Sequence, residues 1–349
     1  MKHLIVLLTC CLPIGLAAQP SSAPATTTPD TPHLIHFTPT SFSNLFTIHR
    51  EPVLRLHSGD TVRTETVDAF GRDRHGIRRQ TGGNPLTGPF YIDNALPGDV
   101  LAITLHEVLL NRPYATTSQA FVSRSMPDSV IRQLDKRLPL VRWHLDLQNH
   151  LGWPDSASDT YDRLKNFKVA LKPFLGCIGV APDNKKEEIL SFFQGPFGGN
   201  LDYSRMTQGV TLYLPVFHPG AYLYMGDAHA VQGDGEISGN ALETSMDVTF
   251  SVRLISSSRL RLPYPRAEDA EYLMTIGTHK DMQKALKIAS AGMLNWLQQE
   301  YHVTLHEATQ VMSTTMEYTI AEIADPEIVV VAKIRKEALA NLPRSPLLP

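Results

Sequence analysis

The segment at residues 226–236, GDAHAVQGDGE, gathers side chains that can bind a metal ion or transfer a proton. Its polar members are Asp227, His229, Gln232, Asp234 and Glu236. If the preceding strand continues through Asp227 and His229, both side chains project from the same face, since strand side chains alternate. A carboxylate and an imidazole on one face can ligate a zinc ion. Asp234 and Glu236 repeat the spacing. A solvated surface hairpin is the alternative interpretation.

Two further regions carry polar residues next to turns. Asn200 and Asp202 follow a glycine pair in GPFGGNLDYSRM at residues 195–206. An amide and a carboxylate on a glycine loop suit an oxyanion pocket or a metal site, and they equally suit a turn in which both cap backbone groups. Asp68 and Asn84 lie in TETVDAFG and GNPLTGPFY. Asp68 is either a ligand or the residue that opens a turn.

Several kinds of protein are disfavoured by what the sequence lacks. No Gly-x-Ser-x-Gly, Walker, His-Glu-x-x-His or Cys-x-x-Cys motif is present, which argues against serine esterases, nucleotide enzymes and the common zinc proteases. The net charge is −3 and no long basic cluster occurs, which argues against nucleic-acid binding. The 349 residues, 42% of them hydrophobic, are typical of a soluble globular enzyme.

The N-terminal residues have the pattern of a secretory signal. Lys2 precedes an apolar run that begins at Leu4, and small residues at Ala17 and Ala18 precede Gln19. We expect residues 1–18 to be a signal peptide, so the protein is exported to the periplasm or the extracellular space. The run is shorter than the roughly 20 residues of a spanning helix, and no later apolar segment is longer, so we expect no stable membrane insertion.

The residues that follow, 19–31, are rich in Pro, Ser and Thr and are predicted to be a disordered lead. Cys177 is the one cysteine left after cleavage, so no internal disulfide can form. Its apolar surroundings indicate a buried small side chain and not a nucleophile.

The elements that must position the polar segments are mainly strands. Period-two alternation with β-branched residues predicts strands at 52–60, 61–70, 88–110 (with a turn at 96–99), 166–182, 210–217, 222–226, 241–255 and 328–334. Residues 185–190 are interpreted as a single helical turn. Residues 120–165 are less regular, and we interpret them as an inserted lid.

The C-terminal part changes to helical periodicity. Residues 281–299 place apolar side chains on one helical face. Thr304 and Glu307 form a predicted capping box for a second helix, which we expect to run to about Ala324, before Pro326. The sequence therefore predicts an α+β, β-rich fold over residues 32–349, with mainly antiparallel sandwich or barrel-like sheets and a C-terminal helical layer.

Several blocks together resemble the acetamidase/formamidase family. They are GNPLTGPFYIDNALPGDVLAI, PFLGCIGVAP, GPFGGNLDYSRMTQGVTLYLPVFHPGAYLYMGDAHAVQGDGE, ALETSMDVTFSV, IGTHKDMQKALKIA and LHEATQVMSTTMEYTIAEI. The first four occur in the family's order within residues 50–255. The resemblance implies one catalytic domain that hydrolyses short linear amides to a carboxylate and ammonia, a bound divalent metal, and a homodimer or larger homo-oligomer. The signal peptide and residues 120–165 depart from the family pattern.

The resemblance also implies roles for individual residues. Asp227 and His229 are expected metal ligands, with Asp68 in support, and Asp202 is a third ligand or orients one. Glu236 is the expected general base and acid, a role that Asp234 could exchange with it. Amide groups expected to bind the substrate are those of Asn84, Asn200 and Gln232. The metal is expected to be zinc, with calcium and manganese as alternatives.

Different functions remain compatible with these residues. A secreted, metal-stabilised β-rich binding module would use the same loop without catalysis. A related hydrolase of cyclic amides or carbamates would use the same chemistry on another substrate, and a lid at 120–165 would alter which amide enters.

Overall fold

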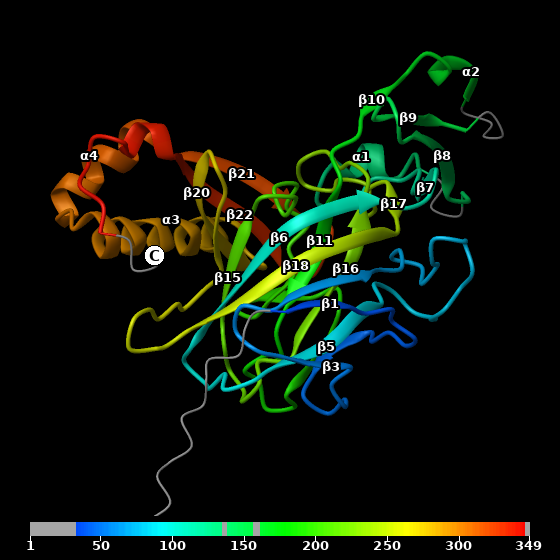
Figure 1. The fold of residues 1–349 in the computed structure, drawn as a ribbon. Helices are drawn as coiled ribbons and strands as arrows, with labels where there is room; N and C mark the ends of the chain where they lie inside the picture. Colours follow the sequence, from blue (N-terminus) through cyan, green and yellow to red (C-terminus); the bar gives the residue numbers. More distant parts are fainter. Residues whose placement is uncertain (1–32, 135–137, 156–160, 346–349) are drawn as a thin grey trace, which may run out of the picture. The chain divides into compact units, whose positions relative to one another are not determined.

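Antiparallel strands dominate the computed structural model, which describes residues 33–345 apart from 135–137 and 156–160 (Figure 1). The predicted signal peptide (1–18) and lead (19–31) lie outside the described residues. Among the helices that are described, none is long and apolar enough to cross a membrane. Two large sheets and two C-terminal helices are the main regular elements of the described residues.

The first sheet has nine strands and carries the C-terminal part of the chain. In spatial order these are β1 (Leu34–His36), β4 (Thr61–Glu65), β18 (Met246–Ile255), β6 (Val100–Leu110), β15 (Thr211–Pro215), β19 (Arg266–Glu268), β20 (Tyr272–His279), β22 (Ile328–Arg335) and β21 (Glu317–Glu322). Every pair is antiparallel except β1 with β4.

The second sheet has eleven strands and carries the polar segments singled out above. Its main path is β10 (Val169–Ala170), β9 (Leu151–Pro154), β8 (Val141–Asp146), β7 (Tyr114–Thr117), β17 (Glu243–Thr244), β16 (Leu223–His229), β11 (Phe174–Gly179), β14 (Gly198–Asn200) and β13 (Gln194–Gly195). β5 (Leu86–Ile92) branches from β16 and pairs with β3 (Leu54–Leu56). A small separate sheet pairs β2 (Leu45–Thr47) with β12 (Glu188–Leu190).

One hydrophobic core joins side chains from both large sheets. Phe250 of β18 meets Phe90 of β5 edge to face, with ring centroids 5.3 Å apart. β18 alternates buried and partly exposed residues along most of its length, so one of its faces packs into this core, whereas all of β11 is buried. The sheets therefore pack as a sandwich, as predicted, and neither path closes into a barrel.

The helices add a C-terminal layer. α3 (Met282–Tyr301) packs on β20 and β22 through Trp296 and Leu297, and α4 (Leu305–Thr315) follows it (Figure 1). The predicted capping box is present, because Thr304 and Glu307 bond each other's backbone groups. Three short helical segments complete the described helices: α1 (Asp128–Ile131), α2 (Tyr161–Leu164) and η1 (Lys336–Leu339).

Two local predictions are wrong. The helix expected to reach Ala324 ends at Thr315, and the next residues form β21, which pairs with β22. The ladder to β22 overrides the helical pattern, and Thr319 and Ile320 are β-branched residues that favour a strand. The helical turn expected at 185–190 is a turn followed by β12.

The region expected to be a lid, 120–165, contains α1 and the β8–β9 hairpin.

Candidate active site

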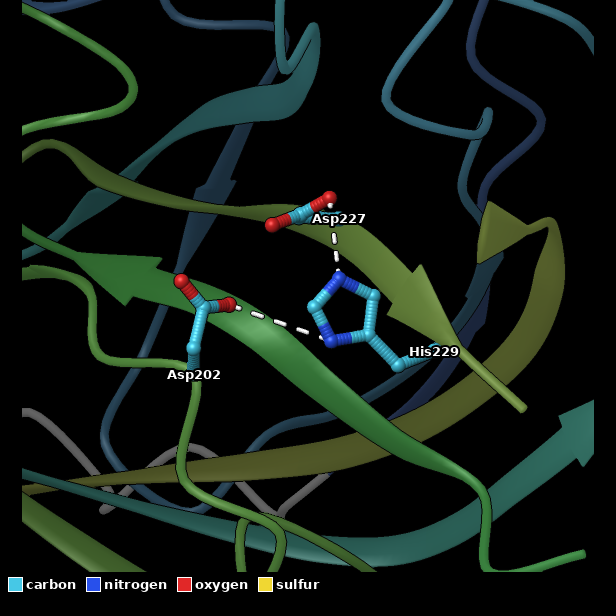
Figure 2. A group of neighbouring side chains, drawn as sticks. All are labelled: Asp202, Asp227 and His229. Atoms are coloured by element: carbon cyan, nitrogen blue, oxygen red, sulfur yellow. Dashed lines mark ion pairs between the residues drawn. The ribbon is translucent and has the colours of Figure 1, made fainter. Parts of the chain in front are cut away.

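Two side chains at the end of β16 and one from a loop about 25 residues earlier meet in the interior of the protein. β16 continues through Asp227 and His229, as predicted, and both are buried. His229 Nε2 lies 3.3 Å from Asp227 Oδ1, and His229 Nδ1 lies 3.8 Å from Asp202 Oδ1 (Figure 2). Asp202 reaches the group from the loop after β14. The imidazole is thus bracketed by carboxylates.

Glu243 of β17 completes this group from the neighbouring strand. Its Oε2 lies 3.3 Å from His229 Nε2, and β17 pairs with β16 at His229. On the opposite side, Phe174 packs edge to face against the imidazole at 4.9 Å. The ring of His229 is therefore fixed by packing as well as by charge.

Gly176 of β11 leaves the space in which these side chains meet. A Cβ at Gly176 would lie 2.3 Å from Asp202 Oδ1, 2.8 Å from Asp227 Oδ2 and 2.9 Å from His229 Cε1. Real Cβ atoms essentially never approach other atoms so closely. The absence of a side chain at this position is a condition for the arrangement.

Asn84 and Asn200 orient the carboxylates. Asn200 donates from Nδ2 to Asp202 Oδ2 at 2.6 Å and to Asp325 Oδ2 at 2.9 Å. Asn84 donates to Asn200 Oδ1 at 3.1 Å and to Asp227 Oδ2 at 3.2 Å. The amide nitrogens of both residues are engaged within the protein, where they hold acidic side chains in position.

Glu236 and Glu322 form a second acidic group beside Asp202. Asp202, Glu236 and Glu322 each have one carboxylate oxygen that lies within 4.8 Å of the other two. The loop that carries Glu236 is bonded to the end of β21, because Gly235 N donates to Ala321 O at 3.1 Å. β21 belongs to the nine-stranded sheet, so both sheets contribute to the site.

Four residues of the site share a left-handed backbone conformation. Asn84, Asp202, Asp227 and Glu236 have positive φ angles of 47°, 42°, 54° and 44°. Non-glycine residues rarely adopt this left-handed conformation, and it persists where surrounding structure enforces it, often at functional sites. The fold therefore holds these side chains in orientations that a relaxed backbone would not give.

Burial and mutual repulsion perturb the acids. Burial, together with the charges of Glu236 and Asp227, raises the pKa of Asp202 well above its ordinary value. Burial and the charge of Asp202 raise the pKa of Glu322 to about 9. For His229, burial by itself would lower the pKa, but Glu243 and Asp227 outweigh it and raise this pKa well above normal. The cluster has more negative charge than its single imidazole can balance.

The residues present are suited to a divalent cation. Buried polar atoms without a hydrogen-bond partner include Asp202 Oδ1, Asp227 Oδ1 and both ring nitrogens of His229. One ligand atom from each of these residues lies within 4.8 Å of the others. Unpaired buried carboxylate oxygens are costly unless a positive centre satisfies them. Oxygen atoms with one imidazole nitrogen suit zinc, manganese or calcium.

The other predicted site residues lie in different places. Asp68 is not part of the cluster, because its buried carboxylate is bonded to Arg112 Nη2 at 2.6 Å and caps the backbone of Phe70 and Arg72. Asp234 is exposed and does not join Glu236, although its spacing repeats that of Asp227 and His229. The turn at residues 231–235 breaks the strand that would have aligned them.

Gln232 and Glu236 border an adjacent cavity of 340 Å³. Gln232 Nε2 donates to Asp202 O at 2.8 Å and to Ala321 O at 3.2 Å. These bonds fix the amide plane and leave Gln232 Oε1 buried without a partner. An unpartnered buried acceptor is costly and would be satisfied by an N–H donor that reaches it.

Sequence reasoning did not identify Gly176, Glu243, Glu322 or Asp325. Glu243 lies in ALETS and Glu322 in YTIAEIA, each a single acid in an otherwise apolar or neutral run. A lone ionisable residue in a buried strand is unusual, and this signal was available. Gly176 and Asp325 have no comparable local signal, because their roles depend on what packs against them.

The site lies largely within a segment matched by a family model. The model of the Acetamidase/Formamidase family matches residues 196–336, which include Asp202, His229 and Glu322. The resemblance to the acetamidase/formamidase family is confirmed.

Cys177, the free cysteine of the described residues, is fully buried. Burial raises the pKa of its thiol well above normal, so it is not a nucleophile.

Individual members of the acetamidase/formamidase family extend the match. A putative formamidase of Schizosaccharomyces pombe is 26% identical over 253 residues, which are 58% of this chain and 61% of that protein, so the chain spans about three fifths of its curated relative. The structure of an acetamidase from Yersinia enterocolitica is 29% identical, with a TM-score of 0.75, covering 90% of this chain and 95% of that one. An acetamidase from Bacillus halodurans shares the fold at 24% identity and a TM-score of 0.73, covering 88% and 99%.

Proposed function

We propose that this protein is an amidase that hydrolyses the C–N bond of linear amides to a carboxylate and ammonia. The observation that carries the proposal is the buried group of Asp202, Asp227 and His229, whose unpartnered atoms lie close to Gln232 and Glu236 at the cavity wall. The acetamidase and formamidase names of its relatives support the same reaction class.

Amide hydrolysis needs an activated water, a stabilised oxyanion and a proton for the leaving amine. We assign Asp227 and His229 as the residues that hold a divalent cation, with Asp202 as the third. A cation held there would supply the positive charge that lowers the pKa of a water and polarises a carbonyl. Zinc is our first candidate, and manganese and calcium are the alternatives.

Glu236 is the proposed proton carrier. Among the described residues that line the cavity, Glu236 is the only ionisable one. It is also part of the acidic cluster. Burial raises its pKa well above the ordinary value, and a hydrogen bond with Glu322 contributes. Two buried carboxyl groups this close share a proton, since both cannot carry charge without compensation. Glu236 can therefore accept a proton from water and return it to the departing amine.

Gln232 is the proposed anchor for the amide group. Its free Oε1 can accept a hydrogen bond from the substrate N–H, while its own N–H groups are held by Asp202 O and Ala321 O. A site built to bond an N–H group discriminates against esters, which lack that donor, because its acceptor would remain unpaired.

The decisive experiment is an ammonia-release assay of the mature protein on a panel of amides, with metal content measured by mass spectrometry. We expect turnover that disappears with a chelator and returns when the cation is restored. Absence of turnover on every amide, with the cation bound, would refute the proposed function. A binding module would instead show no turnover and a lower unfolding midpoint after chelation.

We also propose that the protein is exported and assembles as a homo-oligomer. The pattern of residues 1–18 supports export, and the resemblance to the family supports assembly. Expression of the full chain should yield a product beginning at Gln19 outside the cytoplasm. Retention of Met1 in a cytoplasmic product would contradict export, and light scattering reports the number of subunits.

A further inference from the structure

The cavity beside Glu236 has walls that suit an apolar group. Its described lining includes the side chains of Trp143, Phe167, Val169, Val231, Ile237 and Leu242. We infer that the substrate of this amidase carries a bulky apolar or aromatic substituent, such as a phenyl ring or an alkyl chain of several carbons. The inference rests on the proposed function and specifies its substrate class.

The size of the cavity favours such a substrate over the smallest amides. Its volume is 340 Å³. Formamide and acetamide contain about three or four non-hydrogen atoms and occupy roughly the space of two or three waters, each of which takes about 30 Å³ in the liquid. A substrate of that size would fill about a quarter of the cavity. Pockets for larger ligands begin at about 300 Å³.

Two of the wall residues are apolar and still exposed to solvent. Phe167 is 48% exposed and Ile237 is 39% exposed. Trp143 also lines the cavity, and its ring meets that of Phe167 edge to face with centroids 6.1 Å apart. Exposed apolar side chains that gather around one cavity mark a binding surface, since a ligand that covers them removes their area from water.

The charges of the cavity indicate a neutral substituent. Among the described residues that line it, Glu236 is the only ionisable one. Gln232 and Glu236 are polar members of the lining, and Trp143 and Phe167 form an aromatic pair in it. In this proposal the amide group bonds to Gln232 and the substituent packs against Trp143 and Phe167. A charged substituent would lose its hydration there without gaining a partner.

One wall residue, Trp143, lies in the region expected to be a lid, 120–165, and Phe167 lies just beyond it. Trp143 lies on β8, and Phe167 follows α2. On the same hairpin, His144 pairs with Trp153. The two rings are tilted by 42° with centroids 4.5 Å apart, and the Trp153 ring lies under the ammonium of Lys168 at 4.7 Å. Trp153 is not among the cavity residues, so it provides a matched control within the same hairpin.

The test compares acetamide, hexanamide and phenylacetamide as substrates of the cation-loaded full chain. We expect kcat/KM for the larger amides to exceed that for acetamide by about tenfold or more, in line with the discrimination that apolar pockets achieve. Phe167→Ala and Trp143→Ala should each lower the ratio of phenylacetamide to acetamide by about tenfold. Trp153→Ala should leave this ratio unchanged.

The outcomes separate this inference from the proposed function. Turnover of acetamide with no gain for the larger amides overturns the inference and leaves the amidase proposal intact. If no amide is hydrolysed, the proposed function fails, and calorimetric titration with phenylacetamide still tests the inference. Binding that Phe167→Ala weakens about tenfold and Trp153→Ala does not weaken supports the inference, whereas absence of binding overturns it.

Discussion

Replacing Gly176 with alanine tests whether the space among the carboxylates is essential. The added Cβ would lie 2.3 Å from Asp202 Oδ1, below the 3.0 Å limit seen for real Cβ contacts. Asp202 Oδ1 must then withdraw by at least 0.7 Å, which is the difference between those distances. The Cβ also meets Asp227 Oδ2 at 2.8 Å and His229 Cε1 at 2.9 Å, so no single movement relieves all the contacts.

The expected loss can be estimated from this displacement. A misplacement of about 1 Å in an active site costs on the order of a hundredfold in rate, or about 2.7 kcal/mol at about 1.36 kcal/mol per tenfold. Overpacking in the interior costs about 1–3 kcal/mol of folding stability. We expect Gly176→Ala to remain folded while kcat/KM falls about a hundredfold and bound metal falls below one per chain.

The assay combines ammonia release, metal content and urea unfolding on the same preparation. Gly83→Ala is the matched control, because no atom lies within 4 Å of the position that its Cβ would take and Gly83 does not line the cavity. The control should retain activity and metal within about twofold. If Gly176→Ala also retained both, the metal-binding role assigned to the surrounding group would be refuted.

Further predictions follow from single residues at and around the site. Glu236→Gln should retain the metal and lower kcat/KM by about 10²–10⁴-fold, the usual contribution of general acid–base catalysis; nearly full amidase activity would refute its role. Arg112→Met leaves Asp68 buried and unpaired, so urea unfolding should show a loss of about 3–5 kcal/mol, and a loss below 1 kcal/mol would contradict this. Burial alone would raise the pKa of Glu268, but bonding to Lys336 brings it below the ordinary 4.5. The pair of Glu268 and Lys336 therefore stabilises the fold above about pH 4.5, and this stabilisation is lost as the pH falls through the lower pKa of Glu268 in the folded state. Glu268→Gln should therefore flatten the dependence of the free energy of unfolding on pH in that acid range.

Most of the secondary structure could be predicted because its determinants are local. The apolar face of residues 281–299 and the capping box at Thr304 are patterns within a few turns of chain, and both are present in α3 and α4. The alternation from Val100 onward predicted β6 in the same way. The helix expected at 316–324 failed because the pairing of β21 with β22 is a contact between strands, which no local pattern contains.

The candidate site likewise combines features that the sequence predicted with features that only the tertiary structure showed. The sequence by itself determined that Asp227 and His229 share a face, because strand geometry projects alternate residues together, and that the segment resembles the acetamidase/formamidase family. It also contained the types of side chain that amide hydrolysis needs. Only the tertiary structure decided which acids take part. It separated Asp68 and Asp234 from the cluster, added Glu243 through the pairing of β17 with β16, and added Glu322 from the other sheet. The physical reason is that charge neighbours are set by strand pairing and sheet packing across long stretches of chain, whereas spacing along the sequence constrains only the residues of a single strand or turn.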